Sequence, residues 1–207
     1  MATPATASPA TPPVATAPGT TAVLFATARD DAGLLAGALE WQDGQTLADR
    51  LAGQLRSLGI ADIRLVTRPG NGIAVSGAHV VESEDAAADL RFVAALAREG
   101  RGPLVFAGAE IITQREALAG LLADPRVNTG ILGTSGKIAR PYGYRTKTKR
   151  GRMVSAASPY HTTADPNQTF LGILKVGDAD RPRLAVLAEE LAELRAEPPA
   201  EWVRELD

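Results

Sequence analysis

The chain has 207 residues, of which 45% are hydrophobic, and this is enough to bury the core of one domain. Its 22 Lys and Arg stand against 24 Asp and Glu, so the net charge is −2. The absence of Cys excludes a disulfide framework and all thiolate chemistry, and no segment approaches the 18 or so continuous apolar residues that a membrane helix needs.

Both ends of the chain are predicted to lie outside the folded domain, which we expect to span residues 21–196. Residues 1–20 carry no charged group and are rich in Ala, Thr and Pro, a composition typical of a disordered tail. Residues 197–207 contain Pro198, Pro199 and Trp202 and indicate a linker or the start of a further domain.

The first half of the domain is predicted to begin with a short buried strand and an amphipathic helix. The strand covers residues 22–27 and leads into a Gly-containing turn over residues 28–37. Leucines recur on one face of a helix over residues 46–58, which Gly59 ends. A second strand follows at residues 62–67, and a weaker extended segment at residues 73–81.

Two further helices are predicted with capping residues at their starts. Ser83 is expected to cap a helix that runs to Glu99, and a third strand follows at residues 103–107. Thr113 and Glu116 have the spacing of a capping box and predict the start of the next helix, which Asp124-Pro125 would end.

The last part of the domain is predicted to contain an insertion between strands. Strands are expected at residues 129–132 and 169–176, followed by a helix at residues 182–194. The alternation of strands and helices predicts a Rossmann-like α/β fold, with a mostly parallel sheet and helices on both faces. Residues 133–166 interrupt this alternation, so we expect them to lie over the carboxyl ends of the strands, where such sheets bind ligands.

A basic segment, defined here as residues 137–152, lies inside this insertion. It carries seven Lys and Arg and no Asp or Glu. Pro141 and Gly143 favour a loop or hairpin over a helix, and alternation places Arg145, Lys147 and Lys149 on one face of a strand. Two interpretations remain open: an edge strand protected by charge, or a surface that binds a phosphate-bearing molecule. Nucleic acid is not expected, because the acidic remainder of the chain would repel a polyanion.

Several motifs give the chain a family resemblance. The strand AVLFATA (residues 22–28), the segment DGQTLADRL (residues 43–51) and the strand IRLVT (residues 63–67) resemble the opening of nucleotidyltransferases of the sugar-phosphate and molybdenum-cofactor guanylyltransferase type. The resemblance covers about 150 residues. It implies that a loop after the first strand holds the nucleotide phosphates, and that a carboxylate after the third strand holds Mg²⁺ between nucleotide oxygens.

The resemblance also implies the site residues. The phosphate-binding positions fall on Ala28, Arg29 and Gly33. The Mg²⁺ ligands fall on Glu110 together with Asp30 or Asp31, and the alternative for Glu110 is a surface acid beside a helix start, where the helix dipole favours it. The chain departs from the family pattern in two places: no Lys precedes Lys137, and Gly108-Ala109-Glu110 replaces the usual Gly-Asp.

Cations from the second half of the chain complete the expected site. The phosphate of the acceptor molecule would be received by Lys147, Arg150, Arg152 or Lys175. His161 could donate to a phosphate or serve a structural role. Arg29, Glu110 and Lys175 are the expected catalytic residues, and positioning and charge neutralisation would supply the catalysis.

Two later segments extend the resemblance. GRMVSAASPYH (residues 151–161) and TFLGILKV (residues 169–176) are similar to the nucleotidyltransferase-like domain that precedes some actinobacterial CDP-alcohol phosphatidyltransferases. This resemblance implies a role in phospholipid or glycolipid precursor synthesis. It also implies a cytoplasmic location and a fused C-terminal transferase domain in the membrane.

Two functions remain open from the sequence. In the first, a phosphorylated polyol or sugar attacks the α-phosphorus of CTP or another NTP and releases pyrophosphate. In the second, the domain is a catalytically degenerate module that binds a nucleotide or anionic lipid head groups. An NAD-binding domain is disfavoured because no Gly-x-Gly-x-x-Gly follows the first strand.

Overall fold

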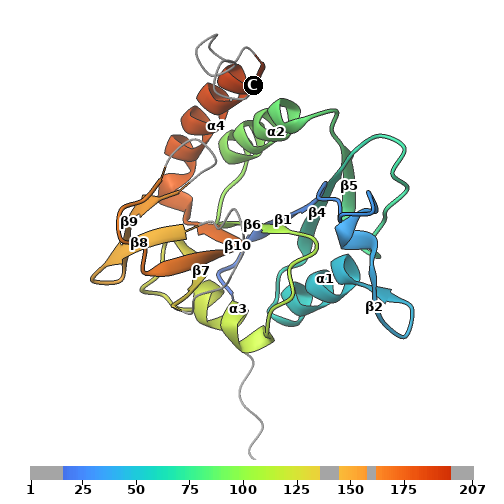
Figure 1. Ribbon diagram of the computed structural model, residues 1–207, viewed down its shortest axis with the longest axis horizontal. Coiled ribbons are helices and arrows are strands. Elements are labelled where there is room, and N and C mark those ends of the chain that lie inside the picture. Colours follow the sequence, from blue (N-terminus) through green and yellow to red (C-terminus); the bar gives the residue numbers. More distant parts are fainter. Residues whose placement is uncertain (1–15, 136–144, 158–161, 197–207) are drawn as a thin grey trace, which may run out of the picture.

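The computed structural model describes residues 16–135, 145–157 and 162–196, which form one mixed sheet with helices on both faces (Figure 1). Four parallel strands make up one half of the sheet, in the order β5 (His79–Glu82), β4 (Asp62–Thr67), β1 (Thr21–Ala26) and β6 (Leu104–Gly108). The strand β10 (Gln168–Val176) pairs with β6 in the antiparallel direction. The predicted α/β fold with a mostly parallel sheet is confirmed.

Three more strands join the sheet through β10. They are β7 (Gly130–Thr134), β8 (Arg145–Lys149) and β9 (Arg152–Ala156), and all of their pairings are antiparallel. Ala107 of β6 pairs with Ile173, whereas β8 pairs with the first two residues of β10. The β8–β9 hairpin therefore continues the sheet beyond the carboxyl end of β6. This agrees with the prediction that residues 133–166 lie near the carboxyl ends of the strands.

The helices form two layers. One face of the sheet is covered by α1 (Leu47–Ser57) and α3 (Arg115–Leu122), and the other by α2 (Ala86–Glu99) and α4 (Arg181–Ala196) (Figure 1). The remaining elements are short: the 3₁₀ turns η1 (Ala36–Ala38) and η2 (Asp178–Asp180), and the small hairpin of β2 (Glu40–Gln42) and β3 (Gln45–Thr46).

Apolar side chains on both faces of the central strands explain this layering. Ala22 and Leu24 of β1 pack with Leu51 and Leu55 of α1 in one core cluster, while Val23 belongs to a second cluster with α2 and α4. A strand that is buried on both faces reads as a continuous apolar run, which is why β1 could be recognised from the sequence.

The helix starts differ from the predicted caps. Asp85, not Ser83, caps α2, and its carboxylate accepts from the amide of Ala88 at 2.7 Å. The predicted capping box at Thr113 and Glu116 is wrong, because α3 begins after Gln114 without a side-chain cap. The capping box instead lies at α1, between Thr46 and Asp49.

Other segments of the chain differ in extent from the prediction. Of the extended segment predicted at residues 73–81, only the part from His79 is a strand, although Ile73 and Val75 are buried in the core. Residues 16–20, which belong to the tail predicted at residues 1–20, are part of the described structure. The amide and the hydroxyl of Thr16 both donate to the carbonyl of Leu58. Residues 197–207 lie outside the described part of the chain. Within that part, no helix combines the length and apolar character needed to cross a membrane.

Candidate functional site

Three loops meet at the carboxyl edge of the parallel strands. They follow β1, β4 and β6, which are neighbours in the sheet and run in the same direction. The loop after β1 holds Arg29 and Asp30, the loop after β4 holds Asn71, and Glu110 follows β6. The loops after β1 and β6 approach each other closely at Gly37. A Cβ at this position would lie only 3.0 Å from the Cβ of Ala109. The fold therefore brings together the predicted phosphate loop and the predicted metal ligand.

The loop after β1 satisfies most of its own hydrogen bonds. The carboxylate of Asp30 accepts from the amides of Ala32 (3.0 Å) and Leu34 (2.8 Å). The amides of Asp30 and Gly33 donate to carbonyls of the same loop, and the carbonyl of Ala28 accepts from Ala36. These amides are therefore not free to cradle a phosphate, which differs from what the resemblance implied.

Arg29 is anchored on both sides. One nitrogen donates to the carbonyl of Gly33 at 2.7 Å and another to the side chain of Asn71 at 3.1 Å. Asn71 in turn donates to the hydroxyl of Thr67 at the end of β4. Arg29 is exposed, so its guanidinium is fixed at the surface of this edge with part of its donor capacity still open to a ligand.

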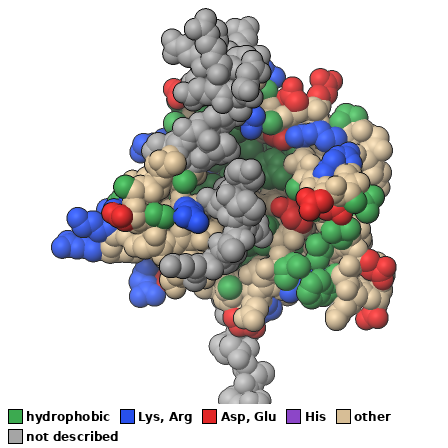
Figure 2. All heavy atoms as spheres, in the orientation of Figure 1, with side chains coloured by type: hydrophobic (Ala, Val, Ile, Leu, Met, Phe, Trp, Pro, Cys, Tyr) green, Lys and Arg blue, Asp and Glu red, His purple; other side chains and the backbone are tan. Residues whose placement is uncertain are grey.

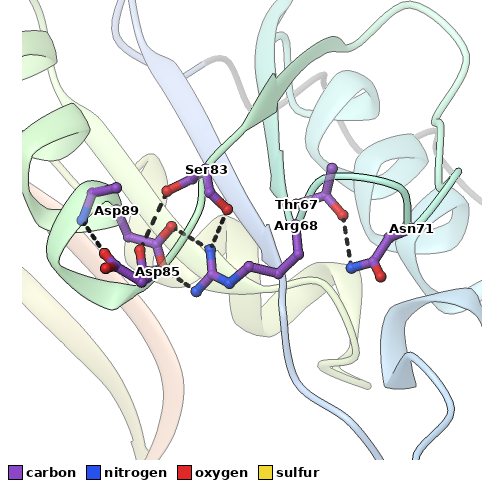
Figure 3. A network of polar contacts seen from close by, with 7 residues as sticks. Thr67, Arg68, Asn71, Ser83, Asp85 and Asp89 are labelled. Atoms are coloured by element: carbon purple, nitrogen blue, oxygen red, sulfur yellow. Dashed lines mark hydrogen bonds and ion pairs between the residues drawn. The ribbon is translucent and has the colours of Figure 1, made fainter.

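A partly buried ion pair holds the neighbouring loop in place (Figure 3). Arg68 at the end of β4 donates to both carboxylate oxygens of Asp89 in α2, each at 2.7 Å, and to the carbonyl of Ser83. The bond to Asp89 raises the pKa of Arg68. This bidentate pair fixes the start of the loop that carries Asn71, and through Asn71 it supports Arg29.

Glu110 carries a polar atom that the described structure leaves without a partner. Its Oε2 is buried, and no hydrogen-bond donor of the described residues reaches it. The carboxylate folds back over Gly108, because a Cβ at that position would lie 2.6 Å and 2.8 Å from its two oxygens. A buried carboxylate oxygen without a donor is costly unless a ligand satisfies it.

The carboxylates at this edge fit a divalent cation only in part. Mg²⁺ is usually held by one or two protein carboxylates, and water and substrate phosphates fill its other positions. Glu110 fits the role of such an anchor, whereas Asp30 is committed to its own loop and Asp31 is exposed. No cluster of three or more His, Asp or Glu at metal-binding distance occurs in the described ranges.

A solved structure has a similar fold. The structure of the inositol-1-phosphate CTP transferase from T. maritima matches 87% of this chain and 83% of its own, with a TM-score of 0.63 and 12% sequence identity. The chain has a nucleotidyltransferase-like, Rossmann-type fold. No protein-family model and no curated protein sequence matches it.

Within the nucleotidyltransferase fold, Lys175 lies away from the carboxyl edge. It pairs with Val105 near the other end of β6 and is 6% exposed. Its ammonium donates to the carbonyls of Leu122 (3.0 Å) and Val127 (2.6 Å) and, at longer range, to that of Leu121. Burial lowers the pKa of Lys175. Its donors are engaged by two carbonyls at the end of α3 and one in the loop that follows, so Lys175 caps the end of this helix.

Among the described residues, the cations of the β8–β9 hairpin make no hydrogen bond or ion pair with Arg29 or Glu110. Lys147 forms an exposed ion pair with Asp165 at 3.7 Å. Arg150 and Arg152 line a separate cavity and do not share it with Arg29 or Glu110. Figure 2 shows Lys and Arg side chains gathered at the hairpin end of the molecule, on the left. His161, the remaining predicted site residue, lies outside the described residues.

The residues that support Arg29 were not predicted from the sequence. Asn71 follows the Pro69-Gly70 turn, and Asp89 lies one turn into α2, so neither belongs to a motif. A search for Arg and Asp at the ends of neighbouring elements could have suggested the Arg68–Asp89 pair. The contact between Asn71 and Arg29 joins the loops after two neighbouring strands, and it could be recognised only in the structure.

Proposed function

We propose that this chain is a nucleotidyltransferase domain. It would transfer a nucleotidyl group from CTP or another NTP to a phosphorylated polyol or sugar. The observation that carries the proposal is the buried Oε2 of Glu110, which no described residue bonds, at the carboxyl edge next to the loop that carries Arg29. Support also comes from the shared fold, because the matching structure is a CTP transferase. A fused CDP-alcohol phosphatidyltransferase domain would consume the product.

Each group at the edge would have a defined task. Arg29, held by Asn71, would donate its remaining N–H groups to the phosphates of the nucleotide. Glu110 would hold Mg²⁺, which neutralises charge on the nucleotide oxygens when it is bound. Lys147, on the strand that extends the sheet beyond β6, is the candidate for the acceptor phosphate.

The reaction itself needs little from the protein beyond positioning. A phosphate oxygen of the acceptor attacks the α-phosphorus of the nucleotide, and the bond from that phosphorus to the β-phosphate oxygen breaks. Pyrophosphate leaves with the electron pair of that bond. Arg29 would hold the phosphates in line with the attacking oxygen, and the carboxyl edge would supply a fixed site for them.

One observation favours a second candidate, a module that binds a nucleotide without turning it over. In the loop after β1, four amides already donate to atoms of the same loop. They are the amides of Asp30, Ala32, Gly33 and Leu34. With these donors engaged and no Lys in the loop, the triphosphate would be held less completely than an efficient transfer requires.

Calorimetry with CTP, GTP, ATP and UTP, with and without Mg²⁺, tests the proposal. We expect one nucleotide to bind preferentially and more tightly when Mg²⁺ is present. A pyrophosphate-release assay with phosphorylated polyols and sugars then separates the two candidates. Release that depends on the acceptor supports transfer, binding without release supports the degenerate module, and no binding by any nucleotide overturns both.

A further inference from the structure

A second concave site lies between α3, β7 and the turn of the β8–β9 hairpin. Its volume is about 970 Å³, at the upper end of the range for pockets that hold small molecules. The lining combines apolar side chains such as Leu132 and Met153 with the amide side chains of Asn128 and Gln168. No aromatic side chain of the described residues lines it, so it offers no platform on which a nucleobase could stack.

The cavity contains guanidinium groups that are not neutralised. Arg150 and Arg152 both line it, and the guanidinium group of neither forms a hydrogen bond or ion pair with any described residue. Arg126 also lines it, but Asp124 pairs with Arg126 at 2.7 Å, and this bond lowers the pKa of Asp124 to about 2. Asp180 is the single carboxylate among the described lining residues, and it accepts from the hydroxyl of Thr129.

The backbone of the hairpin turn places Arg150 at an unusual position. Arg150 has φ 53° and Gly151 has φ 75°, so both central residues of the turn are left-handed. Such a turn matches the twist of a two-stranded hairpin, and its first position favours Asn, Asp or Gly. Arg is uncommon in this conformation, and backbone strain of this kind is found more often at functional sites.

We propose that this cavity binds a phosphate monoester of a small polyol or sugar. The guanidinium groups of Arg150 and Arg152, which pair with no described residue, would hold the dianionic phosphate, since planar guanidinium matches phosphate oxygens bidentately. Asn128 and Gln168 would bond the hydroxyl groups, and the cavity is large enough to enclose the carbon skeleton as well as the phosphate. The site is separate from the carboxyl edge and does not depend on nucleotidyl transfer.

Calorimetry with glycerol 3-phosphate and glucose 6-phosphate tests this site, with glycerol and glucose as uncharged probes. We expect the phosphorylated compounds to bind and the uncharged ones not to bind. Amide shifts on titration should appear at Gly130, Gly133 and Gly151, which line the cavity. Shifts confined to residues 28–35 and 108–112 would place the ligand at the carboxyl edge and overturn the proposal.

The hairpin offers matched variants. Arg150→Asn removes the guanidinium and restores a favoured turn residue before Gly151, so the hairpin is kept. We expect it to weaken phosphate binding about tenfold, the loss of one charge-assisted contact, and Arg152→Gln to act similarly. Lys149→Gln removes the same charge from the neighbouring residue, which does not line the cavity, and should leave the affinity nearly unchanged.

The remaining outcomes each overturn the proposal. If Lys149→Gln weakened phosphate binding as much as Arg150→Asn does, the binding would come from the general positive potential of the hairpin surface and not from a site in the cavity. Binding to phosphatidylinositol vesicles that depends on Arg150, without binding of the soluble compounds, would assign the phosphate to a lipid surface. Glu110→Gln should leave this affinity unchanged, so a failure of the nucleotide site and a failure of the cavity can be told apart.

Discussion

Replacing Glu110 with Gln is expected to remove the dependence of nucleotide binding on Mg²⁺ and to lower turnover by about 100-fold, the usual cost of losing one group that stabilises transition-state charge. Gln has almost the same shape but no negative charge, so the backbone after β6 should be unchanged. The measurements are calorimetry with CTP at several Mg²⁺ concentrations and the rate of pyrophosphate release.

Glu116→Gln is the matched control for this variant. Glu116 is an exposed carboxylate in the first turn of α3, six residues further along the chain, and its removal should change neither quantity. Because Oε2 of Glu110 has no donor among the described residues, Glu110→Gln should not destabilise the fold. Unchanged Mg²⁺ dependence together with a lower unfolding midpoint would make Glu110 a structural residue.

Replacing Arg181 with Met is expected to lower the free energy of unfolding by about 3 kcal/mol, since buried acceptors lose a charged donor. Arg181 is 3% exposed at the start of α4. Its guanidinium donates to the carbonyls of Leu96, Ala97 (3.2 Å) and Gly102 (2.8 Å), at and after the end of α2. Burial lowers the pKa of Arg181, and these three carbonyls compensate the buried charge.

Urea unfolding measures this effect, and Arg183→Met serves as its control. Arg183 lies two residues further along α4 and is exposed, so it loses the same charge and gains the same side chain without uncovering buried carbonyls. We expect Arg183→Met to unfold near the wild-type midpoint. Equal midpoints for the two variants would show that Arg181 does not join α2 to α4.

The regular elements could be predicted because their signals are local and strong. The strand β4 was predicted with the bounds observed, and α1 within one residue at each end. Both combine apolar periodicity with a glycine or proline that ends them. The cap of α2 was misplaced because Ser83 and Asp85 are both good capping residues, and only the backbone direction decides between them.

The candidate site was predictable only in part. The family resemblance implied Glu110 as the carboxylate after the third strand, and in the structure the preceding residue, Ala109, lies against Gly37 of the loop that carries Arg29. The internal bonding of that loop depends on Asp30 turning back onto two amides, which no spacing rule indicates. Lys175 was expected at the acceptor phosphate, whereas its partners are carbonyls that lie about 50 residues away along the chain.

The most direct test of the account is to locate bound CTP on the isotopically labelled protein by amide chemical shifts in the presence of Mg²⁺. We predict shifts in the loop after β1, at Asn71 and at residues 108–112, which together form the carboxyl edge of β1, β4 and β6. Shifts confined to the hairpin cavity, or no shifts at saturating CTP, would contradict a nucleotide site at this edge.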